Sequence, residues 1–241
     1  MAGSMTTESI PAFRLACLDM AGTTVADDGT VLAAFAAALD ELAVAGEAER
    51  ARMTDHVVET MGESKITVFR ALFPGDENRA QAGNQAFEAA YAGRIDAARP
   101  IDGAEQALAE LRADGIAIAL TTGFSRPTAD ALLDHLGWRG LIDLSLTPAE
   151  VGGRGRPHPD LVLAAMARLS DAAPGRPPIR AEQVAVAGDT AGDVRSGLAA
   201  GARIVAGVLT GAHDRARLSE AGATHLLGSV AQLPALLRRP S

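Results

Sequence analysis

Apolar positions follow two patterns along the chain. Short, continuous apolar runs are typical of strands that are buried on both faces of a sheet. Runs of this kind lie at 13–18, 116–120, 141–146 and 184–187. Each run is followed by residues whose apolar positions recur at helical spacing, so helices are expected between the strands. Residues 204–238 continue the same alternation.

Residues 28–97 interrupt this pattern because they show no strand-like alternation. Val31 and Phe35 recur at helical spacing and belong to the first of four expected helices. The other three helices are expected at 47–60, 64–73 and 77–97. The sequence therefore predicts an all-helical insert at 28–97, within an α/β core domain made of residues 1–27 and 98–241.

Strands that alternate with helices along a chain predict a parallel sheet with helices on both faces. The expected fold is α/β, with a doubly wound, Rossmann-like parallel sheet in the core. Ligands of such folds bind beyond the carboxyl ends of the strands. The residues that follow each apolar run are therefore the first candidates for a functional site.

Acidic residues follow two of the predicted strands. Asp19 ends the first strand, Asp189 comes just after the run at 184–187, and Asp193 lies four residues later on the same side of a helical turn. A doubly wound sheet would bring all three to one crevice, where they repel one another unless a hard cation lies between them. Oxygen ligands without a cysteine or histidine cluster favour Mg²⁺.

Anion donors are predicted beside these acids. Thr122 and Gly123 follow the run at 116–120, and Arg156 lies in a basic loop that leads into a helix. The Thr122 hydroxyl, backbone amides near Gly123 and the Arg156 guanidinium would together hold an anion. Carboxylates, Mg²⁺ and such donors are the set that serves a phosphoryl group.

Helix capping is the alternative role for Asp189 and Asp193. Either carboxylate alone could cap the helix that is expected to start near Thr190. Asp19 stands at a matching strand end, and its presence favours the metal site over capping.

Charge and composition narrow the class of protein. A formal net charge of −8 and few aromatic residues (six Phe, one Tyr, one Trp) argue against a nucleic-acid partner. No apolar run reaches the roughly 18 residues that span a bilayer, and residues 1–10 lack the pattern of a signal peptide. The single cysteine, Cys17, is expected in the core, and a reducing cytoplasm is the expected compartment.

The basic residues comprise 21 arginines and a single lysine, Lys65. A composition biased in this way replaces lysine wherever positive charge is enough. A surviving lysine therefore points to chemistry that a guanidinium cannot perform, because an amine can lose its proton and attack carbon. A solvated charge on a helix surface is the alternative role for Lys65.

The strand-end residues resemble the four motifs of the haloacid dehalogenase superfamily, and the resemblance spans nearly the whole chain. It implies that Asp19 is a nucleophile that forms an aspartyl phosphate. It also implies that Thr122 and Arg156 bind the phosphoryl group. The helical insert is similar to the cap domain that closes over the site in this superfamily.

The same resemblance implies the metal ligands. Asp189 and, through water, Asp193 would bind Mg²⁺ together with Asp19. The backbone carbonyl of Ala21 would be a further ligand. Ala21 is also a departure from the superfamily's phosphatases, which carry a second aspartate at this position to protonate the leaving alkoxide.

The insert supplies a second group of motif residues, Met61, Gly62 and Lys65. With Ala21 and Arg156 they make the chain similar to the phosphonoacetaldehyde hydrolase, or phosphonatase-like, branch of the superfamily. This resemblance implies a lysine that forms a Schiff base with an aldehyde substrate. Burial or a nearby cation should lower the pKa of Lys65 so that its amine is partly neutral.

The expected function is Mg²⁺-dependent cleavage of the C–P bond of phosphonoacetaldehyde or a close analogue. A protonated imine accepts the electrons of that bond, so the reaction needs no acid at position 21. The alternatives are a phosphatase that acts on a small phosphate ester and a non-catalytic phosphate-binding protein. Dehalogenation is disfavoured because it does not need the metal-binding acids.

Two positions depart from the phosphonatase pattern. Val68 stands where a histidine is common, and Phe124 stands where an aromatic hydroxyl is common. Proton transfer around the imine would then need another group or water, with His56 as a candidate from its nearby position. A small-molecule phosphonate or phosphorylated compound is the expected partner, and the resemblance suggests a homodimer.

Overall fold

The computed structural model describes residues 12–173 and 175–239. Within them, six strands form one sheet in which every neighbouring pair is parallel, in the order β3-β2-β1-β4-β5-β6. The strands are β1 (Leu15–Asp19), β2 (Ala117–Thr121), β3 (Leu144–Leu146), β4 (Val184–Gly188), β5 (Ile204–Val208) and β6 (His225–Leu227). The predicted doubly wound α/β fold is confirmed.

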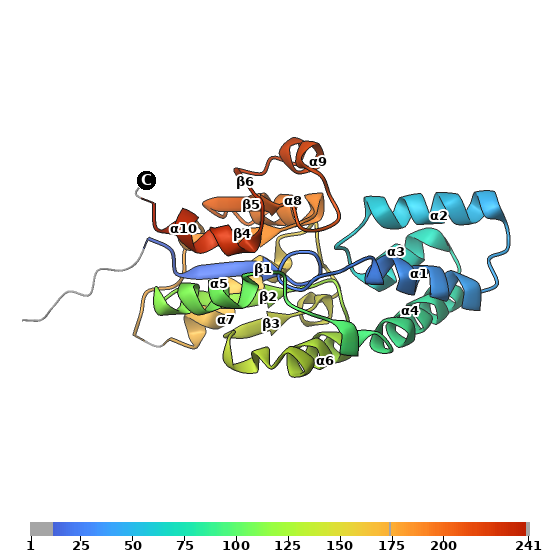
Figure 1. Ribbon diagram of the computed structural model, residues 1–241, viewed down its shortest axis with the longest axis horizontal. Helices are drawn as coiled ribbons and strands as arrows, with labels where there is room; N and C mark the ends of the chain where they lie inside the picture. Colours follow the sequence, from blue (N-terminus) through green and yellow to red (C-terminus); the bar gives the residue numbers. More distant parts are fainter. Residues whose placement is uncertain (1–11, 174, 240–241) are drawn as a thin grey trace, which may run out of the picture.

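Helices flank this sheet and also form a separate group at one end of the molecule (Figure 1). The helices are α1 (Thr30–Glu41), α2 (Glu47–Glu59), α3 (Lys65–Leu72), α4 (Glu77–Ala92), α5 (Ala104–Ala113), α6 (Arg126–Leu136), α7 (Asp160–Asp171), α8 (Ala191–Ala199), α9 (Arg215–Glu220) and α10 (Leu233–Leu237). Short 3₁₀ turns lie at Ile95–Ala97, Trp138–Gly140, Pro148–Val151, Ala181–Gln183 and Val230–Gln232.

The central strand β1 is buried on both faces. Its alternate residues enter different cores: Leu15 and Cys17 pack in the cluster that contains α7, and Ala16 and Leu18 pack in the cluster that contains α5. Cys17 is fully buried, as predicted, and burial raises the pKa of its thiol to about 12. A strand buried on both faces explains why the run is apolar throughout.

The order of the strands determines where a ligand site can form. Chain winding reverses between β1 and β4, which are neighbours in the sheet although they are distant in sequence. Such a switch point opens a crevice at the carboxyl ends of the two strands. Asp19 ends β1 and Asp189 directly follows β4, so both lie at this crevice.

Helices α1 to α4 make the group at one end of the molecule (Figure 1). The Phe35 ring of α1 packs against Phe69 of α3 and Phe87 of α4, with ring centroids 5.1 and 4.6 Å apart. This aromatic cluster accounts for the helical periodicity of the segment. We retain the division into a cap at 28–97 and a core of 1–27 and 98–241 as a proposal.

The two chain segments that join this group to the sheet run side by side. The N–H of Ala26 donates to the carbonyl of Arg99 at 2.9 Å, and the N–H of Ile101 donates to the carbonyl of Thr24 at 2.9 Å. Val25 and Pro100 form an antiparallel bridge between these bonds. Both connections are therefore parts of one hydrogen-bonded ribbon.

Three predicted element bounds are wrong. The helix expected to reach residue 97 ends at Ala92, where Gly93 follows and a 3₁₀ turn begins two residues later. The strand expected from 141 begins at Leu144, because Asp143 uses its carboxylate to accept the N–H of Ile118 at 2.8 Å. The last helix, expected over 230–238, begins at Leu233, after a separate 3₁₀ turn.

Two other sequence predictions concern the membrane and a leader segment. Among the described residues, no helix combines the length and the apolar character needed to cross a bilayer. The prediction for residues 1–10 lies outside the described residues.

Candidate active site

A largely enclosed cavity lies at the carboxyl ends of β1, β2 and β4, with about 380 Å³ of empty space when its mouth is included. Most of the predicted site residues line it. They are Asp19, Ala21, Met61, Gly62, Lys65, Thr122, Gly123, Arg156 and Asp189. The remaining one, Asp193, contacts Arg156 from the first turn of α8. The structure therefore brings together residues from the strand ends and from the helical insert.

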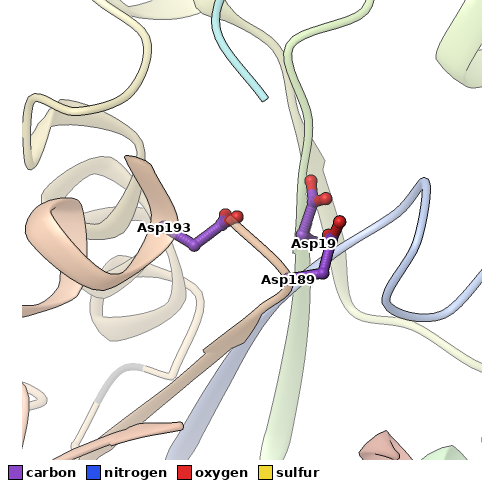
Figure 2. A group of neighbouring side chains, drawn as sticks. All are labelled: Asp19, Asp189 and Asp193. Carbon is purple, nitrogen blue, oxygen red and sulfur yellow. The ribbon is translucent and has the colours of Figure 1, made fainter. Parts of the chain in front are cut away.

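Three buried carboxyl groups meet at one side of this cavity. Asp19 and Asp189 stand at neighbouring strand ends, and Asp193 reaches toward them from α8 (Figure 2). Each offers one oxygen, and these oxygens lie within 4.8 Å of one another. Burial, with help from the neighbouring acids, raises the pKa of Asp19 well above its usual value and that of Asp189 to about 6. Three buried acids of this kind are a suitable site for a hard cation.

Arg156 is the cation that contacts this acidic group. Its guanidinium pairs with Asp19 at 2.6 Å and, through Nε, with Asp193. The same guanidinium donates to the carbonyl and the hydroxyl of Thr121 at 2.8 and 2.9 Å. All three side chains of the ion pairs are buried, so the charges are poorly screened by water. Arg156 is thus held in one position by Asp19, Asp193 and Thr121, and it lines the cavity.

Asp193 also caps the helix on which it lies. Its Oδ2 accepts the N–H of Thr190 at 3.1 Å and the Thr190 hydroxyl at 2.5 Å, and its own N–H donates to that hydroxyl at 3.2 Å. The predicted capping role is therefore present for Asp193. Its other oxygen, Oδ1, pairs with Arg156, so the same side chain caps the helix and contacts a residue that lines the cavity.

Asp189 is held by donors that the sequence did not reveal. Its Oδ1 accepts the Thr23 hydroxyl at 2.9 Å, and its Oδ2 accepts the backbone N–H of Ala212 at 2.7 Å. A backbone amide carries no sequence signal, and Ala212 is 23 residues from Asp189. The two bonds fix the orientation of the carboxylate.

The turn after β2 carries the backbone amides that the sequence offers as anion donors. The N–H of Thr122 donates to Leu146 at 3.1 Å, and the N–H of Phe124 donates to the Thr122 hydroxyl oxygen at 3.2 Å. Two of the three amides around Gly123 are therefore already used. Among the described residues, the amide of Gly123 and the hydroxyl proton of Thr122 are left for a ligand.

The loop between α2 and α3 presses closely on this turn. The carbonyl of Gly62 accepts Arg156 Nη1 at 3.2 Å. A Cβ added to Gly123 would lie 2.7 Å from the Gly62 carbonyl oxygen and closer still to that of Glu63. Gly62 has a φ of +89°, and a Cβ there would lie 2.8 Å from the Thr190 hydroxyl. Both glycines are needed for the insert to close over the strand ends.

Lys65 is buried in the cavity, with 6% of its surface exposed. The aromatic rings of Phe35, Phe87 and Phe124 surround its amine, with centroids 5.8, 5.6 and 5.2 Å from Nζ. Burial lowers the pKa of Lys65 to about 8, partly opposed by the negative charge of Asp19. The alternative of a solvated surface charge is wrong, because the side chain is buried.

Neither of the two departures from the phosphonatase pattern supplies a proton carrier. Val68 is a buried core residue, and Phe124 contributes a ring without a hydroxyl. His56 does not line the cavity, and its buried Nε2 has no hydrogen-bond partner in the described part of the chain. Asp27, which we did not single out from the sequence, does line the cavity.

Comparison with known proteins gives a consistent result. The family model described as haloacid dehalogenase-like hydrolase matches residues 13–201. The chain is 30% identical to a phosphonoacetaldehyde hydrolase of Parabacteroides distasonis over 77% of each chain. It is 29% identical to the probable phosphatase IndB of Dickeya dadantii over 86% of each chain.

A solved structure supports the same fold. The phosphonoacetaldehyde hydrolase-like protein of Oleispira antarctica superposes with a TM-score of 0.76 at 21% identity. The match covers 94% of this chain and 91% of that one. At this identity the likeness concerns the fold.

Proposed function

Because the chain belongs to the haloacid dehalogenase-like hydrolase family, we propose that it cleaves the C–P bond of phosphonoacetaldehyde or a close analogue. The observation that carries this proposal is that Lys65 and Asp19 line the same enclosed cavity. A buried amine with a lowered pKa is suited to form an imine, and a carboxylate is suited to attack phosphorus. The substrate is then a small molecule with both an aldehyde and a phosphonate.

The phosphonate end would lie against the strand ends. We assign its binding to Thr122, Gly123 and Arg156, which offer a hydroxyl, an amide and a guanidinium at one side of the cavity. Met61 and Gly62 close that side from the insert. In-line attack by Asp19 would then give an aspartyl phosphate, which water hydrolyses.

The three acids fit a magnesium ion. Asp19, Asp189 and Asp193 are all oxygen donors, and no cysteine or histidine shares their cluster in the described residues. We further assign the backbone carbonyl of Ala21 as a ligand, since Ala21 lines the same cavity. When bound, the ion would neutralise the charge that develops on the phosphoryl oxygens.

The aldehyde end would react with Lys65. Its neutral amine adds to the carbonyl carbon, and loss of water leaves a protonated imine. When Asp19 attacks phosphorus, the electrons of the C–P bond move into a new C=C bond and an enamine forms. Ala21 cannot donate a proton, and this route needs none from that position. Protonation and hydrolysis of the enamine release acetaldehyde and restore Lys65.

A phosphatase acting on a small phosphate ester is the second candidate. The relative described as a probable phosphatase covers more of the chain than the phosphonoacetaldehyde hydrolase does. The groups assigned to the phosphoryl end serve either reaction. Loss of an acid at position 21 typically costs a phosphatase about 10²–10⁴-fold in rate, which weighs against this candidate.

Three expectations about partners and location belong to the same proposal. The net charge of −8 disfavours a nucleic-acid partner. The resemblance to phosphonatases suggests a homodimer, and the cysteine count suggests a cytoplasmic enzyme.

Borohydride trapping tests the proposal directly. The protein is incubated with phosphonoacetaldehyde and Mg²⁺, reduced with borohydride, digested and mapped by mass spectrometry. We expect irreversible loss of activity and a mass increment on Lys65. Turnover of the aldehyde with unmodified Lys65 would exclude the Schiff base, and robust hydrolysis of phosphate esters without an aldehyde would favour the phosphatase.

A further inference from the structure

Imine chemistry at Lys65 needs a group that delivers and removes protons at the carbon end of the substrate. Among the described residues, five charged ones line the cavity, and four already have assignments: Asp19, Asp189, Arg156 and Lys65 itself. The fifth is Asp27, at the start of the insert. Within the described residues it is the one lining carboxyl group that the phosphoryl and metal sites do not use.

Asp27 and Lys65 line the same cavity, as does Val31, whose N–H donates to the Asp27 carboxylate. Burial raises the pKa of Asp27, and the charge of Lys65 partly opposes this rise. The charge of Asp27 in turn acts to raise the pKa of Lys65. Glu88 also acts on Lys65, but it does not line the cavity and it accepts the hydroxyls of Ser125 and Thr128. Asp27 is therefore the better placed of the two carboxyl groups for proton transfer.

Asp27 also borders a second, more open pocket. That pocket is formed where the two connecting segments meet the loop after β5, and it includes Asp28, Arg99, Asp102 and Thr210. Its empty volume is about 550 Å³, open solvent included. The same residue, Asp27, thus lines both the enclosed cavity and the more open pocket.

The carboxylate of Asp27 is held in place by the first turn of α1. Its Oδ1 accepts the N–H of Val31 at 3.0 Å, and its backbone carbonyl accepts the N–H of Thr30 at 2.7 Å. Asparagine has the same shape and keeps an oxygen for Val31, but it cannot transfer a proton. Asp27→Asn therefore separates proton transfer from helix capping.

We propose that Asp27 is the acid–base residue for the carbon end of the reaction and that it exchanges protons with solvent through the outer pocket. This inference rests on the proposed function. The Asp27 carboxyl gives a proton to the departing hydroxyl of the carbinolamine, which leaves as water and yields the protonated imine. Reprotonated from the outer pocket, it then gives a proton to the terminal carbon of the enamine. The resulting Asp27 carboxylate takes a proton from the water that attacks the imine carbon.

Proton exchange of acetaldehyde tests this step without any phosphorus chemistry. In D₂O, the wild-type protein should exchange the methyl protons of acetaldehyde through the Lys65 imine and its enamine, as followed by proton NMR. We expect Asp27→Asn to slow this exchange by about 100-fold or more. The equilibrium amount of borohydride-trapped imine should stay near that of the wild type, and Asp27→Glu should restore part of the exchange.

Asp96→Asn is the matched control. Asp96 is an exposed carboxylate of the insert and lines neither the enclosed cavity nor the outer pocket. This variant should exchange the methyl protons of acetaldehyde at the wild-type rate. Lys65→Arg should abolish both exchange and trapping, which sets the baseline.

The possible results separate the two proposals. Exchange by Asp27→Asn within about twofold of the wild-type rate would overturn the role of Asp27 and leave the proposed function intact. Loss of the trapped imine in Asp27→Asn, without recovery in Asp27→Glu, would also overturn the role of Asp27. Asp27 would then be needed for the fold rather than for proton transfer. Wild-type protein that cleaves the phosphonate without exchanging acetaldehyde would also overturn the role. Wild-type protein that shows neither trapping nor cleavage would overturn the proposed function itself.

Discussion

The amine of Lys65 lies 5.2 Å from the centroid of the Phe124 ring, although the two residues belong to different parts of the molecule. Lys65 begins α3 in the insert, and Phe124 follows β2 at the sheet. The surroundings that lower the pKa of the lysine are therefore complete only when the insert and the sheet are in contact. Contact between the insert and the sheet is therefore part of what lowers the pKa of Lys65.

Removing the Phe124 ring should raise the pKa of Lys65. In Phe124→Ala, water reaches the amine, and we expect its pKa to move from about 8 toward the usual 10.5. The pH at which borohydride trapping is half-maximal should rise in parallel. Phe124→Leu is the control, since it keeps an apolar side chain there and should stay near the wild-type midpoint. Equal midpoints for Phe124→Ala and wild type would show that burial by this ring does not set the pKa.

Lys65→Arg should keep the fold and the positive charge but remove the imine. A guanidinium does not form an imine with the aldehyde, so we expect C–P cleavage to fall by about 1000-fold or more. The thermal midpoint should change little. Rates on phosphonoacetaldehyde and on a panel of phosphate esters, measured side by side, check this. Substantial cleavage of the phosphonate by the arginine variant would mean that Lys65 acts only through its charge.

Magnesium should stabilise the protein more at pH 7.5 than at pH 5. The pKa of Asp189 is raised to about 6, so between pH 4 and 6 the folded chain binds more protons than the unfolded chain. The free energy of unfolding of the metal-free protein should therefore fall as pH rises through this window. Above pH 6 the carboxylates are deprotonated and free to bind the ion. Binding then adds about 2.7 kcal/mol to the free energy of unfolding when the concentration of free Mg²⁺ is 100 times Kd.

Thermal unfolding with and without Mg²⁺ at the two pH values measures this effect. Asp189→Asn should lose most of the stabilisation, whereas the exposed Asp96→Asn should keep it. If Mg²⁺ raised the thermal midpoint of Asp189→Asn as much as that of the wild type, the ion would have to bind elsewhere.

Gly123→Ala should hinder closure of the insert. The added methyl would press on the carbonyl oxygens of Gly62 and Glu63, which must move away. A displacement of about 1 Å at a reacting group can cost about 100-fold, so we expect kcat/KM to fall by 10- to 100-fold. Gly140→Ala is the control because a Cβ there meets nothing within 4 Å. Activity of Gly123→Ala equal to that of Gly140→Ala would show that close contact is not required.

Residues that follow strands were the part of the site that could be predicted from the sequence. Asp19, Thr122 and Asp189 each follow a continuous apolar run, and parallel strands necessarily bring their carboxyl ends to one edge. Lys65 was found from composition, since a single lysine among 21 arginines needs an explanation. The strand-end residues were thus found from local patterns, and Lys65 from the composition of the whole chain.

The other parts depend on packing between segments, which leaves no local pattern. Asp27 lies in a polar turn that resembles any connection, and its position at two pockets exists only in the folded chain. The rings of Phe35 and Phe87 fit a helical core pattern, although they also enclose an amine. The late start of β3 follows from one side-chain contact of Asp143, which no periodicity records.

The ribbon formed by the two connecting segments restricts how the insert can move. Its bonds between Ala26 and Arg99 and between Ile101 and Thr24 tie the two connections together, so neither can swivel alone. Two separate tethers would allow the insert to rotate and slide, whereas a paired ribbon leaves bending as the easiest motion. If the insert bends about this ribbon, it would return Lys65 to the same position relative to Asp19 each time, and repeatable placement of these two side chains would be a property of the connecting ribbon.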